Sequence, residues 1–272
     1  MHSLPMEVGE DSLWYLFVSY NNSPLLITDW DYEGHDDLQS PTARFTVQTL
    51  DIVVDFSVQA KKQGMAVSMA PAESYLDPTV ENGSIDSRFS LSLDLPPRAW
   101  ATDRYHASEE DRKLIESKGF SHAGRQSYAY ILSKAGIETF DWVSLQLYEA
   151  YSPFSHDIHR RKLKQSEALM ARIQRLIEGY TVIDLPVEAS EYEVKIPASK
   201  IVLGIANGWA DGFKFCKVES SELRAAYEST LASYGEGFLG VMFWTIEEEG
   251  DSRLTHSLSE EFRQIGRDSK EL

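Results

Sequence analysis

Short apolar runs recur along the chain, and polar or turn-forming residues separate them. Met65–Ala70, Trp142–Tyr148, Lys200–Ala206 and Phe238–Thr245 are runs of this kind. Their length and near-continuous apolar character are typical of strands buried in a parallel sheet. Leu25–Glu33 is a fifth predicted strand, in which three apolar residues lead into an acidic end.

Between these runs, apolar residues recur at helical spacing. The first helix is predicted to start at Ser40-Pro41 and to end at Gly64. Two charged helices are predicted near 108–118 and 125–134. The apolar stripes are Val47, Leu50, Val54 and Val58; Leu169, Ile173, Leu176, Ile177 and Tyr180; Leu223, Tyr227, Leu231 and Tyr234; and Leu254, Leu258, Phe262 and Ile265. Alternating strands and helices predict a parallel α/β sheet or barrel.

Composition narrows the classes of partner. The chain has 272 residues, enough for one barrel or two smaller domains, and a formal net charge of −17. That charge argues against nucleic acid and anionic membranes, whereas a neutral polysaccharide is indifferent to it. Cys216 is the single cysteine, so an intramolecular disulfide is excluded. The apolar runs are too short for membrane insertion, and Met1–Glu10 lacks the basic start and apolar core of a signal peptide.

The strongest chemical signal is the acidic end of the Leu25–Glu33 run. Asp29, Asp31 and Glu33 lie two residues apart, so a strand would place all three carboxylates on one face. This spacing should arise about once by chance in so acidic a chain, and a second copy does occur at Glu247–Asp251. The copy at Asp29 differs because it continues an apolar run and alternates with aromatic residues. Such a face suits the mouth of a pocket in which protons are moved.

Several of these strand endings resemble those of one protein family, and they occur in the same order along the chain as in that family. Asp29-Trp-Asp-Tyr-Glu33 resembles the end of the Asp-x-Asp-x-Glu signature of family 18 glycoside hydrolases, the chitinases and their relatives. In that family the motif closes the fourth strand of a (β/α)8 barrel. Gln146 and Tyr148 resemble the Gln-x-Tyr element of its sixth strand, and Trp244 resembles the tryptophan that ends its last strand. The resemblance covers nearly all of residues 25–266.

The resemblance implies an α/β fold of the (β/α)8 TIM-barrel type that is incomplete, with strands four to eight present and the first three largely missing. Residues 25–272 would form the barrel portion, with a long insertion at about 77–140. Residues 1–24 would precede it as a segment without an assigned fold. A strand is predicted there at Leu13–Ser19 and a turn at Asn21–Pro24.

The resemblance also implies an activity, the hydrolysis of β-linked N-acetylglucosamine-containing glycans such as chitin by a substrate-assisted retaining mechanism. Glu33 would be the general acid and later the base. Asp31 would hold the acetamido N–H of the substrate, and Asp29 would share a proton with Asp31. Tyr148 would hydrogen-bond the acetamido oxygen, and Trp244 would pack under the sugar ring.

Further substrate-binding residues are assigned at the ends of the later strands. The family often has Asn where this chain has Glu149, and Asp-Gly where it has Leu26-Ile27. The expected partner is an oligo- or polysaccharide, the expected state is a monomer, and no cofactor or metal is expected. The residues assigned to substrate binding are Gln146, Glu149, Asn207, Trp209 and Trp244.

Two other interpretations stay open. One is a non-catalytic, chitinase-like protein that binds carbohydrate. The other is a calcium loop, because Asp29, Asp31, Glu33 and Gly34 fit positions one, three, five and six of an EF-hand, although Ser40 stands where that loop requires Glu. The localisation is left open, with a secretory or extracellular site expected if the N-terminus is truncated.

Overall fold

The computed structural model describes residues 18–20, 23–25, 46–71, 73–76, 79–81, 84–89, 126–148, 153–159, 161–206 and 216–244. Its longer helices are α1 (Val47–Lys62), α3 (Ser127–Ala135), α4 (Pro153–His159), α5 (Gln165–Glu178) and α6 (Ser220–Tyr234). Three short 3₁₀ helices are η1 (Glu73–Tyr75), η2 (Ile137–Thr139) and η3 (Ala198–Lys200). Within these ranges, no helix is long and apolar enough to cross a membrane.

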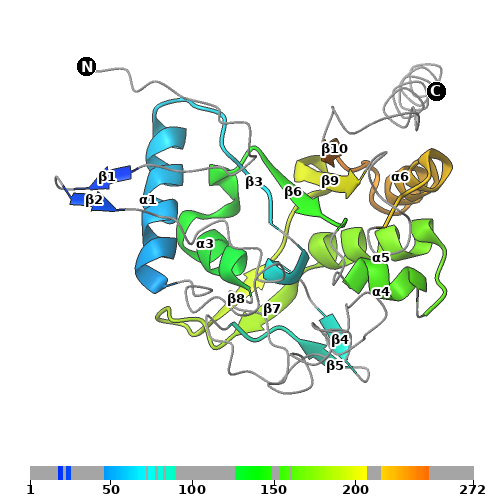
Figure 1. The fold of residues 1–272 in the computed structure, drawn as a ribbon, viewed down its shortest axis with the longest axis horizontal. Coiled ribbons are helices and arrows are strands. Elements are labelled where there is room, and N and C mark those ends of the chain that lie inside the picture. Colours follow the sequence, from blue (N-terminus) through cyan, green and yellow to red (C-terminus); the bar gives the residue numbers. More distant parts are fainter. Residues whose placement is uncertain are drawn as a thin grey trace, which may run out of the picture.

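A parallel sheet forms the centre of the described structure (Figure 1). Its strands are β3 (Ser68–Met69), β6 (Trp142–Gln146), β9 (Ile201–Ala206) and β10 (Gly240–Trp244). They lie side by side in chain order, and all three pairings are parallel. The apolar runs from Met65 onward are thus confirmed as strands of one α/β sheet.

The two faces of this sheet differ in composition. One face belongs to the main hydrophobic core, which also includes buried residues of all five longer helices. The strand residues in that core are Met69, Val143, Leu145, Ile201, Leu203, Ile205 and Val241. The alternating residues, which a strand directs to the opposite face, include Ser68, Ser144, Gln146, Gly204, Ala206 and Gly240. That opposite face therefore mixes small and polar residues with the larger side chains of Trp142, Val202 and Met242.

The described helices follow three of the four predicted stripes, with corrected ends, whereas the stripe from Leu254 to Ile265 and the helix predicted near 108–118 lie outside the described residues. Helix α1 begins at Val47 and not at Ser40-Pro41, because the Thr46 hydroxyl caps it by accepting from the Thr49 N–H at 3.1 Å. The chain leaves α1 through Gly64, whose φ of +77° suits glycine. Helix α5 ends at Glu178, so placing Tyr180 on its apolar stripe was wrong. The predicted helices near 125–134 and 223–234 are confirmed as α3 and α6.

Within the described ranges, three antiparallel hairpins accompany the sheet. They are β1 (Val18–Tyr20) with β2 (Ser23–Leu25), β4 (Thr79–Glu81) with β5 (Ser84–Asp86), and β7 (Tyr180–Ile183) with β8 (Glu191–Val194). The first corrects two predictions. Ser23 and Pro24 pair within β2, so the predicted turn at Asn21–Pro24 is too long, and Leu25 pairs antiparallel with Val18. The rest of the predicted Leu25–Glu33 strand lies outside the described residues.

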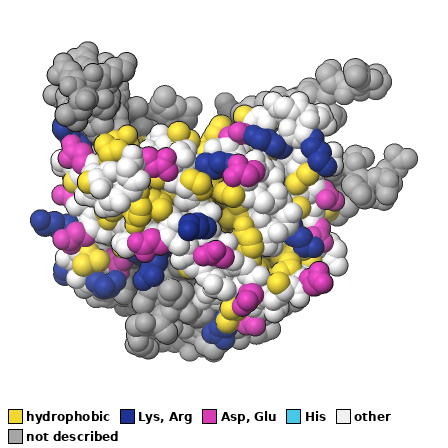
Figure 2. All heavy atoms as spheres, turned by 180° about the vertical axis from the view of Figure 1, so that it is seen from behind, with side chains coloured by type: hydrophobic (Ala, Val, Ile, Leu, Met, Phe, Trp, Pro, Cys, Tyr) yellow, Lys and Arg dark blue, Asp and Glu magenta, His cyan; other side chains and the backbone are white. Residues whose placement is uncertain are grey.

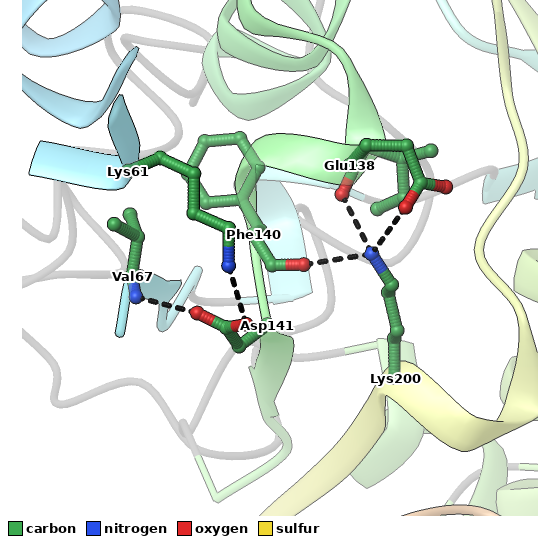
Figure 3. Close-up of polar contacts among 7 residues, drawn as sticks. Lys61, Val67, Glu138, Phe140, Asp141 and Lys200 are labelled. Atoms are coloured by element: carbon green, nitrogen blue, oxygen red, sulfur yellow. Dashed lines mark hydrogen bonds and ion pairs between the residues drawn. The ribbon is translucent and has the colours of Figure 1, made fainter. Parts of the chain in front are cut away.

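Charged side chains tie the amino ends of the strands together (Figure 3). Asp141, directly before β6, accepts from Lys61 Nζ of α1 at 2.5 Å and from the Val67 N–H at 2.8 Å. Lys200, directly before β9, donates to the carbonyls of Ile137 and Phe140 at 3.1 and 2.9 Å and pairs with Glu138 at 3.2 Å. These contacts fix the end of the sheet opposite to the one that carries Gln146.

Asp141→Asn should make the stability of the protein less dependent on pH in the acid range. The hydrogen bond from Lys61, followed by that from the Val67 N–H, lowers the pKa of the Asp141 carboxyl. A carboxyl whose pKa is lower in the folded state stabilises above its unfolded pKa, and this contribution is lost as the pH falls through the folded value. Urea midpoints measured from pH 7 to pH 3 should therefore fall less steeply in the variant. Parallel curves for the two proteins would contradict this account.

Candidate active site

The carboxyl ends of β6, β9 and β10 lie in register. Gln146 pairs with Gly204, which pairs with Met242, and two residues further on Ala206 pairs with Trp244. The Leu147 N–H continues the ladder by donating to the Gly204 carbonyl at 2.8 Å. In parallel α/β sheets, ligands bind beyond the carboxyl ends of the strands, where loops supply functional groups. The sheet edge that carries Gln146 is therefore where a site is expected.

Gln146 and Tyr148 form the best-defined polar pair at this edge. The Tyr148 hydroxyl donates to Gln146 Oε1 at 2.7 Å, and Gln146 Nε2 donates to the Ala70 carbonyl at 2.6 Å. Tyr148 is only 7% exposed, whereas Gln146 is partly exposed. The prediction that these two side chains share one face is confirmed by their hydrogen bond. Together they connect β6 to the residue that follows β3.

Gly204 shapes the floor between β6 and β10. A Cβ at this position would lie 3.0 Å from Met242 Cε, 3.1 Å from the Gln146 Cα and 3.1 Å from the Leu145 carbonyl oxygen. Glycine therefore allows the Met242 side chain to lie across β9 beside Gln146. Sequence analysis did not single out Gly204 or Met242. The available signal was the two-residue alternation of side chains along a strand, which places both residues on the same face as Gln146.

The remaining predicted site residues are not placed by the described structure. Trp244 ends β10, so its backbone position agrees with the prediction, and its side chain lies outside the description. The residues wholly outside the described ranges are Asp29, Asp31, Glu33, Glu149, Asn207 and Trp209. Of the predicted set, the structure thus brings together Gln146 and Tyr148.

Sequence analysis missed a cluster of buried charges behind this edge. Glu73, in η1 after β3, is 1% exposed and accepts from Arg172 Nε of α5 at 2.5 Å and from the Phe154 N–H at 2.9 Å. Arg172 Nη1 also pairs with Asp157 of α4 at 2.8 Å, and Asp157 pairs with Arg161 at 2.9 Å. The cluster ties the segment that follows β3 to both helices. A glutamate soon after an apolar strand was the available sequence signal.

Two further observations concern nucleophiles and metal ligands among the described residues. Burial, and then the negative charge of Glu73, raise the pKa of the Cys216 thiol to about 12, so it stays protonated and is a poor nucleophile. Among the described residues, no group of three or more His, Cys, Asp or Glu side chains could hold a metal ion.

The described surface also bears on the class of partner. On the face drawn in Figure 2, Lys and Arg side chains are interspersed with Asp and Glu, and hydrophobic side chains lie between them. This face therefore lacks a continuous basic patch of the kind that binds nucleic acid.

The fold and this edge define an α/β protein with a hydrogen-bonded polar pair, Gln146 and Tyr148, at the carboxyl end of a parallel sheet. No protein-family model and no curated protein matches the chain. Among solved structures, it is similar to a GH18 chitinase from Pseudoalteromonas aurantia, with a TM-score of 0.44, 10% identity, and coverage of 82% of this chain and 59% of that chain. It is also similar to the Legionella pneumophila ChiA C-terminal domain, with a TM-score of 0.46, 11% identity, and coverage of 78% and 58%.

The chain thus spans less than three-fifths of the length of either structure. One of the two structures is a GH18 chitinase, a member of the family that the strand endings resemble.

Proposed function

We propose that the chain is a glycoside hydrolase that cleaves β-linked N-acetylglucosamine-containing glycans, with chitin or chitooligosaccharides as substrates. The observation that carries the proposal is the hydrogen-bonded pair of Gln146 and Tyr148 at the carboxyl end of β6. This pair lies at the edge of a parallel sheet where (β/α)8-barrel enzymes bind their substrates. The sequence provides the acidic residues that the chemistry needs at Asp29, Asp31 and Glu33.

In the proposed reaction, Glu33 donates its proton to the glycosidic oxygen as the bond from that oxygen to the anomeric carbon breaks. The acetamido oxygen of the substrate forms a new bond to the same carbon and gives an oxazolinium-like intermediate. Asp31 accepts from the acetamido N–H and balances the positive charge, and Asp29 shares a proton or hydrogen bond with Asp31. Water then attacks the anomeric carbon, gives a proton to Glu33 and restores the acetamido group.

Strand geometry argues against Asp29 and Glu33 as a two-carboxylate pair, and Asp31, about half as far from Glu33, is proposed to hold the acetamido group instead. At about 3.3 Å per residue, the backbones of Asp29 and Glu33 would lie about 13 Å apart in a strand. Retaining enzymes with a carboxylate nucleophile need a separation of about 5–5.5 Å, and inverting enzymes about 6.5–9.5 Å. Tyr148 offers a hydroxyl and not a second carboxylate. The acetamido group is therefore the proposed nucleophile, held by Asp31 and Tyr148 in a near-attack geometry.

The proposed architecture is the later part of a (β/α)8 barrel, in which β3, β6, β9 and β10 correspond to strands five to eight. Residues 25–272 would form this portion, with an insertion at about 77–140, and 1–24 would precede it. Support comes from the matching order of the strands in the chain and in the sheet.

Chromogenic chitooligosaccharides should be hydrolysed by the protein, with and without a chelator. Matched substrates that carry a hydroxyl or a free amine at the 2-position should not turn over, because the proposed nucleophile is then missing. Release of the chromophore measures the turnover of both groups of substrates. Binding without hydrolysis would instead identify a non-catalytic carbohydrate-binding protein. Loss of activity with the chelator would support the calcium loop. Efficient cleavage of glucose oligomers would overturn the substrate-assisted mechanism.

A further inference from the structure

The side chain of Gln146 bridges a backbone carbonyl and a hydroxyl. Its Nε2 donates to the Ala70 carbonyl at 2.6 Å, and its Oε1 accepts from the Tyr148 hydroxyl at 2.7 Å. Its own backbone N–H donates to the Pro71 carbonyl at 2.9 Å. Two of these hydrogen bonds attach Gln146 to the segment Ala70–Pro71, and the third attaches it to Tyr148, two residues further along its own segment.

The Ala70 carbonyl determines which way the Gln146 amide faces. A carbonyl oxygen only accepts hydrogen bonds, so the amide nitrogen must face Ala70, and the reverse orientation would bring two oxygens to 2.6 Å. The amide oxygen must then face Tyr148 and accept its one hydroxyl proton. The direction of this proton is therefore set by a backbone group of the neighbouring strand segment.

The carbonyl that orients Gln146 belongs to a firmly held segment. Three residues beyond Ala70, Glu73 is buried and bound by Arg172 and by the Phe154 N–H. On the other side, β3 pairs with β6 through Ser68 and Met69. Because both flanks are held, the Ala70 carbonyl can act as a fixed reference for the amide.

We propose that Gln146 is a positioning residue: its amide, oriented by the Ala70 carbonyl, fixes the direction of the Tyr148 hydroxyl proton for substrate binding. An acetamido oxygen that receives this proton would share it with Gln146 Oε1 in a three-centre hydrogen bond. The proposal deepens the proposed function and rests on it for its kinetic test.

Gln146→Met removes both hydrogen-bonding ends of the side chain while keeping its length. It should lower kcat/KM for a chitooligosaccharide about tenfold, the effect expected for one lost hydrogen bond. Gln174→Met is the matched control, because Gln174 is exposed on α5 and, among the described residues, donates to Glu178 Oε1 of its own helix at 2.8 Å. This control should keep the activity of the wild type, and equal activity in both variants would overturn the proposal.

Gln146→Glu separates positioning from packing through its pH profile. The ionised carboxylate accepts hydrogen bonds but cannot donate to the Ala70 carbonyl, so activity relative to the wild type should be low at neutral pH. When protonated, the introduced carboxyl reproduces both ends of the amide, and the ratio of variant to wild-type kcat/KM should rise about tenfold as the pH falls. A ratio that stays constant with pH would overturn the proposal.

A second readout does not depend on hydrolysis. The protein is labelled with ¹³C at the Cζ of tyrosine, a position whose chemical shift responds to hydrogen bonding of the hydroxyl, and Tyr148→Phe assigns the resonance. The Tyr148 signal should shift in Gln146→Met and stay in place in Gln174→Met, and an unshifted signal in Gln146→Met would overturn the proposal. If the wild type hydrolyses no glycan, the proposed function fails, and this measurement alone decides the role of Gln146.

Discussion

Arg172→Met is expected to lower the free energy of unfolding by about 3–5 kcal/mol. Arg172 is the shared partner of two buried carboxylates, contacting Glu73 at 2.5 Å and Asp157 at 2.8 Å. Glu73 is 1% exposed and Asp157 is 4% exposed, so solvent cannot replace the lost charge. Methionine keeps the aliphatic part of the side chain, as far as the position of Nε, and its packing along α5. The loss of stability would thus come from leaving buried charge uncompensated.

Urea unfolding at pH 7, followed by circular dichroism, measures this change. The matched control is Arg224→Met, which removes an arginine from an exposed pair with Glu228 on one helix, 2.8 Å apart. Exposed pairs of this kind contribute about 0.3–0.5 kcal/mol, so the control should unfold close to the wild type. A loss below about 1 kcal/mol for Arg172→Met would contradict the assignment of a buried charged cluster.

The sheet could be predicted from the sequence because burial on both faces leaves a simple signal. Runs such as Ile201–Ala206 are apolar throughout, and all six of these residues are buried. The pairing of Gln146 with Tyr148 followed from the two-residue period of a strand. Helix ends were harder to predict. Ser40-Pro41 was predicted as the start of α1, whereas the hydrogen bond from the Thr49 N–H to the Thr46 side chain places the start at Val47.

The features that the sequence did not reveal depend on distant partners. Tyr180–Ile183 and Glu191–Val194 are short and half exposed, and each becomes a strand by pairing with the other. Glu73 appears as an ordinary polar residue until α5 brings Arg172, 99 positions later, against it. The Ala70 carbonyl has no sequence signature, because a backbone group gains its role from the side chain that reaches it. Local periodicity carries no information about such contacts.

The order of the strands in the sheet relates the described structure to the acidic run that the sequence predicts. Because β3, β6, β9 and β10 are adjacent in chain order, a strand that precedes β3 would pair at its free side. In the proposed barrel, the run that ends in Asp29, Asp31 and Glu33 would occupy that place. Its carboxylates would then lie at the same edge as Tyr148, one strand beyond Ala70.

Glu33→Gln should therefore lower the turnover of a chromogenic chitooligosaccharide by about 10²–10⁴-fold while leaving its binding largely intact. Glutamine has nearly the shape of glutamate but has no proton to give to the leaving oxygen, so the effect should fall on kcat and not on affinity. Steady-state kinetics and calorimetric binding separate the two quantities. Glu228→Gln, on the exposed surface of α6, makes the same chemical change away from the site and should leave both unchanged. Unchanged turnover in Glu33→Gln would mean that another acid, with Glu149 and Glu247 as the next candidates, protonates the leaving group.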